Sequence, residues 1–137
     1  MVNRGVAPYD TSTPVGVLRV TIGDTIFSPL VPPETGFGDY EMFSDAELSE
    51  FVGLGDNNVF RSAGFAFMSL AGKAALESKM VKDYDLQVDL RNRSRDLREA
   101  AFGFFAQADA QDERLGLDDF MFITQTGDYE PQDGWLP

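Results

Sequence analysis

Residues 56–78, DNNVFRSAGFAFMSLAGKAALES, decide the fold of this chain. Apolar side chains recur at spacings of three and four residues after the Asp-Asn-Asn cap, which predicts a helix over 57–78. Further apolar side chains lie off that stripe, so the helix is apolar almost all round and must be covered on several sides. We therefore expect one face of it to be buried against a neighbouring subunit, unless the helix is wholly central to its own subunit. The residues expected at this subunit–subunit interface are Phe60, Gly64, Phe65, Met68 and Gly72.

A short helix is expected over 14–23, because both of its ends carry clear signals. Thr13 is a suitable N-cap, and Pro14 would occupy the first helical position, where a missing N–H does no harm. Gly23 supplies a residue that adopts a left-handed conformation readily and so ends the helix.

A second short helix is expected over 44–53. Ser44 and Glu47 have the spacing of a capping box, in which each side chain accepts a hydrogen bond from the backbone N–H of the other residue. Phe43 before the cap and Leu48 after it fit the hydrophobic staple that often accompanies this motif.

A fourth helix is expected over 90–112, with Asp89 as its N-cap and Gly116 beyond its end. Residues 24–43 contain three prolines and two glycines, which predicts a long loop. The sequence therefore predicts an all-α fold, a small bundle of about four helices, in one domain that spans 1–116.

The last segment, 117–137, differs in composition and is expected to form an extended C-terminal arm. Its apolar run is short and β-prone, lies between acidic and Gly- and Pro-containing stretches, and is followed by the single Trp of the chain. Such a segment can add a strand to the sheet edge of a partner, or it can fold back over its own core. The residues expected to bind a partner are Phe120, Met121, Phe122, Ile123 and Trp135.

Charge is distributed unevenly along the chain, whose formal net charge is −12. Residues 1–60 carry 2 basic and 9 acidic side chains, residues 61–110 carry 8 and 7, and residues 111–137 carry 1 and 7. Binding to nucleic acid through its phosphates needs clustered Lys and Arg, so we do not expect it here. The acidity also serves solubility.

The groups that catalysis and metal binding commonly use are scarce. The chain has no Cys and no His, which excludes thiolate and imidazole zinc sites, disulfides, and Cys or His nucleophile systems. The stretch 83–94 begins like a calcium loop, but Val88 and Ser94 stand where an EF-hand needs Gly and Glu. The longest apolar stretch, 62–72, is too short to cross a membrane. We therefore expect no enzyme activity, cofactor, metal or membrane partner.

Several stretches together resemble the head-to-tail adaptor proteins of long-tailed bacteriophages. Residues 19–24, RVTIGD, resemble the R-x-x-I-G-D end of the first helix in that family, and residues 43–51, FSDAELSEF, resemble its second helix. Residues 57–63 are similar to the start of its long third helix, and residues 78–101 to its link and last helix. The likeness covers 17–110 in the expected order. The proline-rich segment after the first helix and the long acidic tail depart from the pattern.

This resemblance implies a compact helical subunit of the virion, located at the head–tail interface and made in the host cytoplasm. It implies a ring, expected to hold 12 copies, between the portal protein and the stopper or tail-completion proteins. DNA would pass through the ring without specific binding, helped by acidic side chains that repel its phosphates. In that family the C-terminal arm commonly reaches the portal, which makes 117–137 the expected portal-binding arm.

Two other classes of function stay open from the sequence. An acidic DNA mimic, which occupies the basic groove of a nuclease or repressor, is suggested by the net charge of −12. Against it, the acidic residues gather at the chain ends, and the longest predicted helix is apolar. Another minor virion or tail-completion protein is the second alternative, and a helix-dominated structure would weigh against a tail terminator, because that class is usually α/β.

Overall fold

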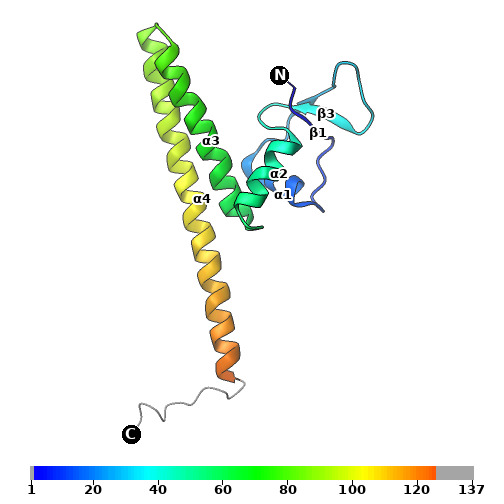
Figure 1. Cartoon of the computed structure of the whole chain (residues 1–137), viewed down its shortest axis with the longest axis vertical. Coiled ribbons are helices and arrows are strands. Elements are labelled where there is room, and N and C mark those ends of the chain that lie inside the picture. The colour runs from blue at the N-terminus through cyan, green and yellow to red at the C-terminus, as the bar shows by residue number, and fades with distance from the viewer. Residues whose placement is uncertain (1, 126–137) are drawn as a thin grey trace.

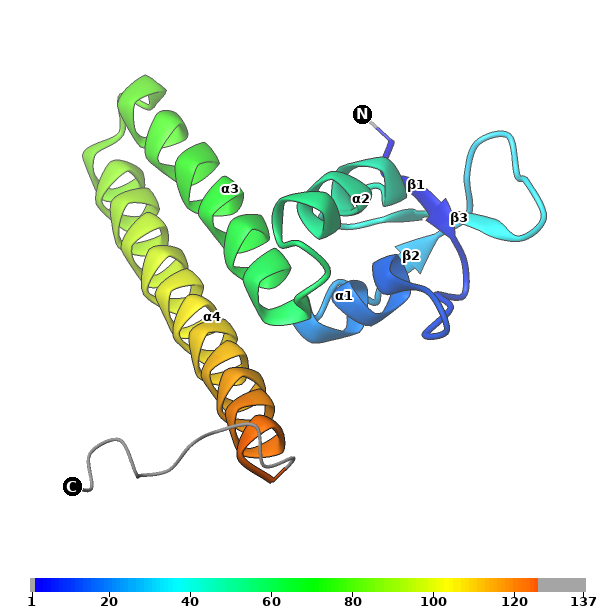
Figure 2. The ribbon, with the colours of Figure 1, turned by 60° about the horizontal axis from the view of Figure 1, so that its bottom comes forward.

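The computed structural model describes residues 2–125, with side chains as far as residue 116, and contains four helices and a small sheet in that part of the chain (Figure 1). Helices α3 and α4 form a long antiparallel hairpin, and the other elements lie beside the beginning of α3 (Figures 1 and 2). A mostly helical protein is confirmed, but a purely all-α fold is wrong. In chain order the elements are β1 (Arg4–Val6), α1 (Pro14–Ile22), β2 (Phe27–Ser28), β3 (Phe37–Tyr40), α2 (Asp45–Leu54), α3 (Val59–Met80) and α4 (Tyr84–Gln125).

The caps of α1 and α2 are those expected from the sequence. The Thr13 hydroxyl oxygen accepts a hydrogen bond from the Gly16 N–H, and Gly23 ends α1 with a φ of 82°. Both halves of the capping box before α2 are present, between Ser44 and Glu47. Local side-chain chemistry thus fixes where these two helices begin, which is why the sequence could predict them.

The loop expected over 24–43 contains two strands, and this expectation is wrong in that respect. Strand β3 lies between β1 and β2, and both pairs are antiparallel. Arg4 pairs with Asp39, and Phe27 pairs with Tyr40. Strands of two to four residues leave little pattern in the sequence, and β3 is completed by residues more than thirty positions away.

Helix α3 begins where the sequence predicts it. The side-chain oxygen of Asn58 accepts hydrogen bonds from the backbone N–H groups of Phe60 and Arg61. The start expected for α4 is wrong, because Asp89 lies within that helix. Its actual start is marked by Asp83, whose carboxylate accepts the Asp85 N–H.

Helix α4 is much longer than expected, since it runs for 42 residues and spans about 63 Å. The end expected near residue 112 is wrong, and the domain boundary expected after residue 116 falls inside the helix. The extended backbone expected within the arm is also wrong for four candidate residues, which lie in α4, whereas Trp135 lies outside the described residues. Once a helix has formed, each further residue adds a hydrogen bond, so a short β-prone run does not stop it. These four residues are Phe120, Met121, Phe122 and Ile123.

The main core lies where α1, α2 and the beginning of α3 meet. Phe43 and Leu48, the expected staple pair, are both fully buried there. The hairpin itself is closed mainly by small side chains, among them Ala71, Ala101 and Ala108, which let the two helices approach closely. The buried residues of the main core, where α1, α2 and α3 meet, are Leu18, Ile22, Phe43, Leu48, Ala63 and Ala66.

Candidate functional site

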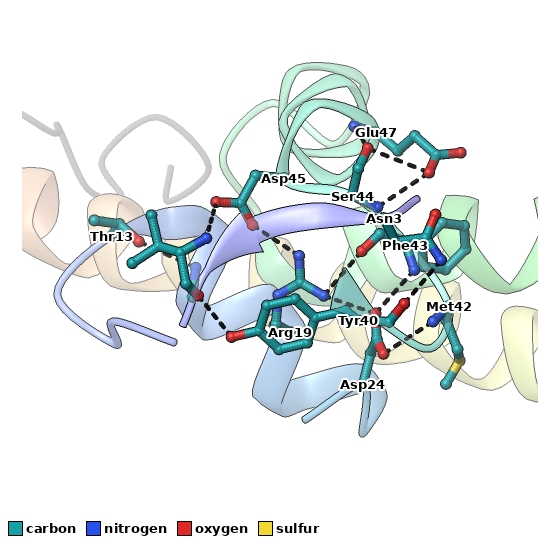
Figure 3. A network of polar contacts seen from close by, with 12 residues as sticks. Asn3, Thr13, Arg19, Asp24, Tyr40, Met42, Phe43, Ser44, Asp45 and Glu47 are labelled. Carbon is teal, nitrogen blue, oxygen red and sulfur yellow. Dashed lines mark hydrogen bonds and ion pairs between the residues drawn. The ribbon is translucent and has the colours of Figure 1, made fainter. Parts of the chain in front are cut away.

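A buried arginine ties the elements of the N-terminal half together (Figure 3). The side chain of Arg19 is 1% exposed, and its Nη1 lies 2.7 Å from Asp24 Oδ2 and 3.0 Å from the Phe43 carbonyl oxygen. Its Nη2 lies 2.7 Å from Asp45 Oδ1. The guanidinium carbon also sits 3.6 Å from the centre of the Tyr40 ring. One side chain therefore joins α1, β3 and α2, and we call this network the Arg19 clamp.

Asp24 is the fully buried carboxylate of the clamp. Besides Arg19, its carboxylate accepts hydrogen bonds from the backbone N–H groups of Met42 and Phe43 (Figure 3). Three donors on one buried carboxylate compensate for its loss of water. All the charged groups of the clamp are thus occupied with one another, and this arrangement holds structure together without offering a group for chemistry.

Elsewhere in the described part, the structure offers no arrangement typical of catalysis or metal binding. No group of three or more Asp or Glu side chains among the described residues could hold a metal ion. A groove of about 380 Å³ lies between α1, α2 and α3, and is lined mainly by apolar side chains, including Val17, Val52 and Val59. Its hydroxyls are on Ser12, Thr13 and Ser62, and no Asp, Glu or Lys is among the lining residues. The Ser12 hydroxyl donates to the carboxylate of Asp10, which does not line the groove.

The hairpin uses part of the interface that the sequence assigned to a neighbouring subunit. A Cβ atom placed on Gly64 would lie 2.6 Å from the ring of Phe105, so α4 of the same chain makes the close approach that Gly64 allows. Phe65 also packs on Phe105, edge to face, with ring centroids 5.2 Å apart. The sequence could not show this, because the partner of both residues lies forty positions later.

The other three residues expected at the subunit interface lie on α3 with part of their surface accessible. Phe60 is half-buried, and Met68 is 37% exposed. Gly72 is exposed and has open space where a Cβ atom would point. A contact of these residues with a neighbouring subunit stays a prediction.

Large apolar side chains on the outside of the hairpin were missed by the sequence reasoning. Tyr84 is 70% exposed and Phe102 is 54% exposed, both on α4. The sequence signal for the exposure of Phe102 is that it follows Ala101 directly, because the residue next to an inward-facing position on a helix is turned away from the partner helix. Exposed apolar side chains mark protein–protein contacts where they form a contiguous patch. The exposed apolar residues of the hairpin are Met68, Leu76, Met80, Tyr84, Leu86, Phe102 and Leu115.

A basic groove lies on the same hairpin, although the chain as a whole is strongly acidic. It has a volume of about 460 Å³, and its charged lining consists of Lys79 from α3 and Arg91, Arg95 and Arg98 from α4. The spacing of four and three residues between these arginines places them on one helix face, which is the signal in the sequence, but only the structure shows that α3 leaves this face open.

Further down the hairpin, an exposed ion pair fastens α4 to the first turn of α3. Arg61 Nη2 lies 2.6 Å from Asp112 Oδ2 and 3.4 Å from Asp109 Oδ1. The hydrogen bond from Arg61 lowers the pKa of Asp112, and the same bond raises the pKa of Arg61. Beyond Asp112, α4 runs on past the beginning of α3 (Figure 1).

Comparisons of the chain with protein families, with curated proteins and with solved structures found no match. Among the described residues, no helix is both long and apolar enough to pass through a membrane.

Proposed function

We propose that this chain is a non-enzymatic virion subunit, a head-to-tail adaptor of a long-tailed bacteriophage. It forms a ring, expected to hold 12 copies, between the portal protein and the stopper or tail-completion protein. One observation carries the proposal: among the described elements, α4 packs only against α3, although α4 is 42 residues long. Most of its surface is therefore free for other chains.

The exposed side chains on that surface of α4 support a role as a subunit of a larger assembly. Tyr84, Leu86 and Phe102 are each close to half exposed or more, and all lie on α4. Apolar surface of this kind gains free energy when it is removed from water, at about 25 cal/mol per Å². A ring or a stack of rings provides such burial on several sides of each subunit, as a monomer does not.

The Arg19 clamp supports the family resemblance. Arg19 and Asp24 come from the RVTIGD stretch, and Asp45 comes from the FSDAEL stretch, so the two motifs meet in one buried network. The two stretches that carry the resemblance are therefore in direct contact in the fold.

The acidity of the chain also fits this location. Side chains that carry a net charge of −12 per copy would repel DNA phosphates if they line the channel, so that the genome slides through without specific binding. The proposed location is the virion, at the head–tail interface, after assembly in the host cytoplasm.

The acidic DNA mimic is the competing class. It needs an acidic surface without positive charge, since it has to imitate a phosphate backbone. Arg91, Arg95 and Arg98 interrupt such a surface on the longest helix. The charge pattern of α4 thus favours the adaptor. Another minor virion or tail-completion protein would show neither addition to the portal ring nor inhibition of a nuclease or repressor in the experiment below.

The test is capture of the chain by the portal ring encoded in the same phage genome. The full-length chain is compared with a truncation after Gln125, which keeps α4 whole and removes 126–137. Native mass measurement then gives the number of copies bound per portal ring. As a matched control, Arg19→Met weakens the fold without touching the outer surface of α4.

Near-stoichiometric addition of the full-length chain to the portal ring is the expected result. If the truncated chain fails to bind while its circular dichroism is unchanged, the arm is the portal-binding part. Equal binding of both chains would keep the adaptor and reject the arm. No binding of the full-length chain to the portal, together with inhibition of a nuclease or repressor, would reject the adaptor in favour of the DNA mimic.

A further inference from the structure

Helix α4 carries two charged faces over the same part of its length. The first, which we call the basic face, consists of Arg91, Arg95 and Arg98, and it borders the groove shared with α3. The second, which we call the acidic stripe, consists of Asp85, Asp89, Asp96 and Glu99. All seven side chains are exposed. At about 100° per residue, the two faces point roughly 120° apart around the helix.

The charges of the basic face are hardly compensated within the chain. Arg91 donates to the Gln87 amide oxygen, and Arg98 donates to the Ser94 hydroxyl. Among the described residues, only Arg95 has a carboxylate within ion-pair distance, that of Asp96 at 3.7 Å, and both side chains are more than 60% exposed. Such an exposed pair contributes little, so the positive charge stays available to another chain.

The position of the faces determines which symmetry suits them. A two-fold contact centred on the basic face would set that face against itself, because both copies contribute the same patch to such a contact. Two parallel copies at the same height instead bring the basic face of one against the acidic stripe of the next. A contact of this head-to-tail kind, repeated by rotation, gives a ring when the rotation between copies is a whole fraction of a turn, and an open filament otherwise.

Two adjacent residues, Phe102 and Gly103, extend the two charged faces by one turn toward the C-terminal end of α4. Phe102 follows Arg98 by four residues and is 54% exposed, so it prolongs the basic face with an apolar ring. Gly103 follows Glu99 by four residues and prolongs the acidic stripe, and nothing lies within 4 Å of the place where its Cβ would be. Glycine inside an exposed helix costs about 1 kcal/mol relative to alanine. No contact within the described chain explains that cost.

We propose that the ring contact between neighbouring copies is made by these two faces. The basic face of one copy binds the acidic stripe of the next, and Phe102 of the first copy lies against Gly103 of the second. The occupant of the free face of α4 is therefore a second copy of this chain. This inference rests on the proposed function, because it specifies how the proposed ring is held together.

The absence of Cys from the chain makes the contact directly testable. Full-length chains carrying Phe102→Cys are mixed with full-length chains carrying Gly103→Cys, and mass tags distinguish the two. The mixture is treated with a short bismaleimide, once free in solution at low salt and once bound to the portal ring. The expected product joins one chain of each kind. Coupling of Phe102→Cys chains mainly to each other would indicate a two-fold contact and overturn the proposal.

Charge reversal gives a second, independent readout. The pair Arg91→Glu with Arg95→Glu, or the pair Asp89→Lys with Asp96→Lys, should each lower the mixed cross-linked product by about tenfold, because like charges then face each other. All four changes in one chain exchange the charges at positions 91 and 95 with those at 89 and 96, and should restore the product. Lys82→Glu, exposed and outside α4, is the matched control and should have little effect.

The two proposals fail separately. A chain that adds to the portal but shows no mixed product, or no rescue by the exchanged charges, keeps the adaptor and overturns this contact. A chain that gives the mixed product and the rescue in solution but never binds the portal keeps the contact between copies and overturns the adaptor. Circular dichroism of each variant excludes loss of the fold as the cause.

Discussion

Arg19 Nη1 lies 2.7 Å from Asp24 Oδ2, and both side chains are almost completely shielded from water. The two residues are only five positions apart, with the left-handed Gly23 between the helix and the aspartate. The pair therefore closes a local turn, while the other hydrogen bonds of Arg19 reach the Phe43 carbonyl oxygen and Asp45 of α2, far along the chain. A short local motif thus organises the whole N-terminal half.

Removing the arginine should destabilise the fold strongly. Arg19→Met leaves the carboxylate of Asp24 buried without its partner, and breaking one side of a buried pair costs about 3–5 kcal/mol. The free energy of unfolding from urea denaturation measures the loss. Adding Asp24→Asn should cost less in the Arg19→Met background than in the natural chain, because the two residues act together. A loss below about 1 kcal/mol for Arg19→Met would contradict the role of the clamp.

Two glycines of α3 should respond in opposite directions to the same substitution. Gly64→Ala places a methyl group 2.6 Å from the Phe105 ring and forces the helices apart, at a cost of about 1–3 kcal/mol. Gly72→Ala meets open space, so the better helix propensity of alanine should stabilise the protein by up to about 1 kcal/mol. Thermal unfolding of both variants tests this. Equal effects would show that α4 does not pack on Gly64.

The Arg61–Asp112 pair should make the hairpin sensitive to acid. The hydrogen bond from Arg61 holds the pKa of Asp112 below its ordinary 3.8. Because this folded-state pKa is depressed, the stabilisation is present above pH 3.8 and is lost as the pH falls through the folded pKa. A carbon-detected NMR titration of the carboxyl group measures the shift. Arg61→Gln should move the pKa back toward 3.8, while Arg93→Gln should leave it unchanged.

Tyr40 should titrate late at alkaline pH. Burial raises its pKa above the ordinary 10.0, and its hydroxyl donates a hydrogen bond to the Val6 carbonyl oxygen at 2.6 Å. Because the folded-state pKa is raised, the stabilisation is complete below pH 10 and is lost as the pH rises through the folded pKa. Tyrosinate absorbance, with Tyr40→Phe as the reference, follows this titration. The same variant should lose about 1 kcal/mol of stability at neutral pH.

The helix starts show how far local chemistry reaches. Thr13, Ser44 and Asn58 each cap a helix through an oxygen that accepts a backbone N–H within three residues. Signals of this range are complete in the sequence, so the beginnings of three helices could be predicted. The end of α4 could not, because neither Gly116 nor a β-prone run is strong enough to stop a helix that is already formed.

The candidate interface was predictable only in outline. The sequence shows that the helix over Val59–Met80 is too apolar to be exposed, but apolarity does not name the partner. The structure assigns Gly64 and Phe65 to Phe105 of the same chain and leaves Met68 and Gly72 accessible. The two charged faces of α4 also needed the structure, because α3 decides which side of α4 is covered.

By itself, the sequence determined the mostly helical character of the fold, the caps of three helices and the acidic character of the chain, since each depends on composition or on contacts a few residues long. The tertiary structure decided the small sheet, the length of α4, the partner of Gly64 and the meeting of Arg19 with Asp45. The sheet, the Gly64 contact and the meeting of Arg19 with Asp45 each join residues more than ten positions apart. Such pairings are selected by the packing of the whole chain, which no local pattern encodes.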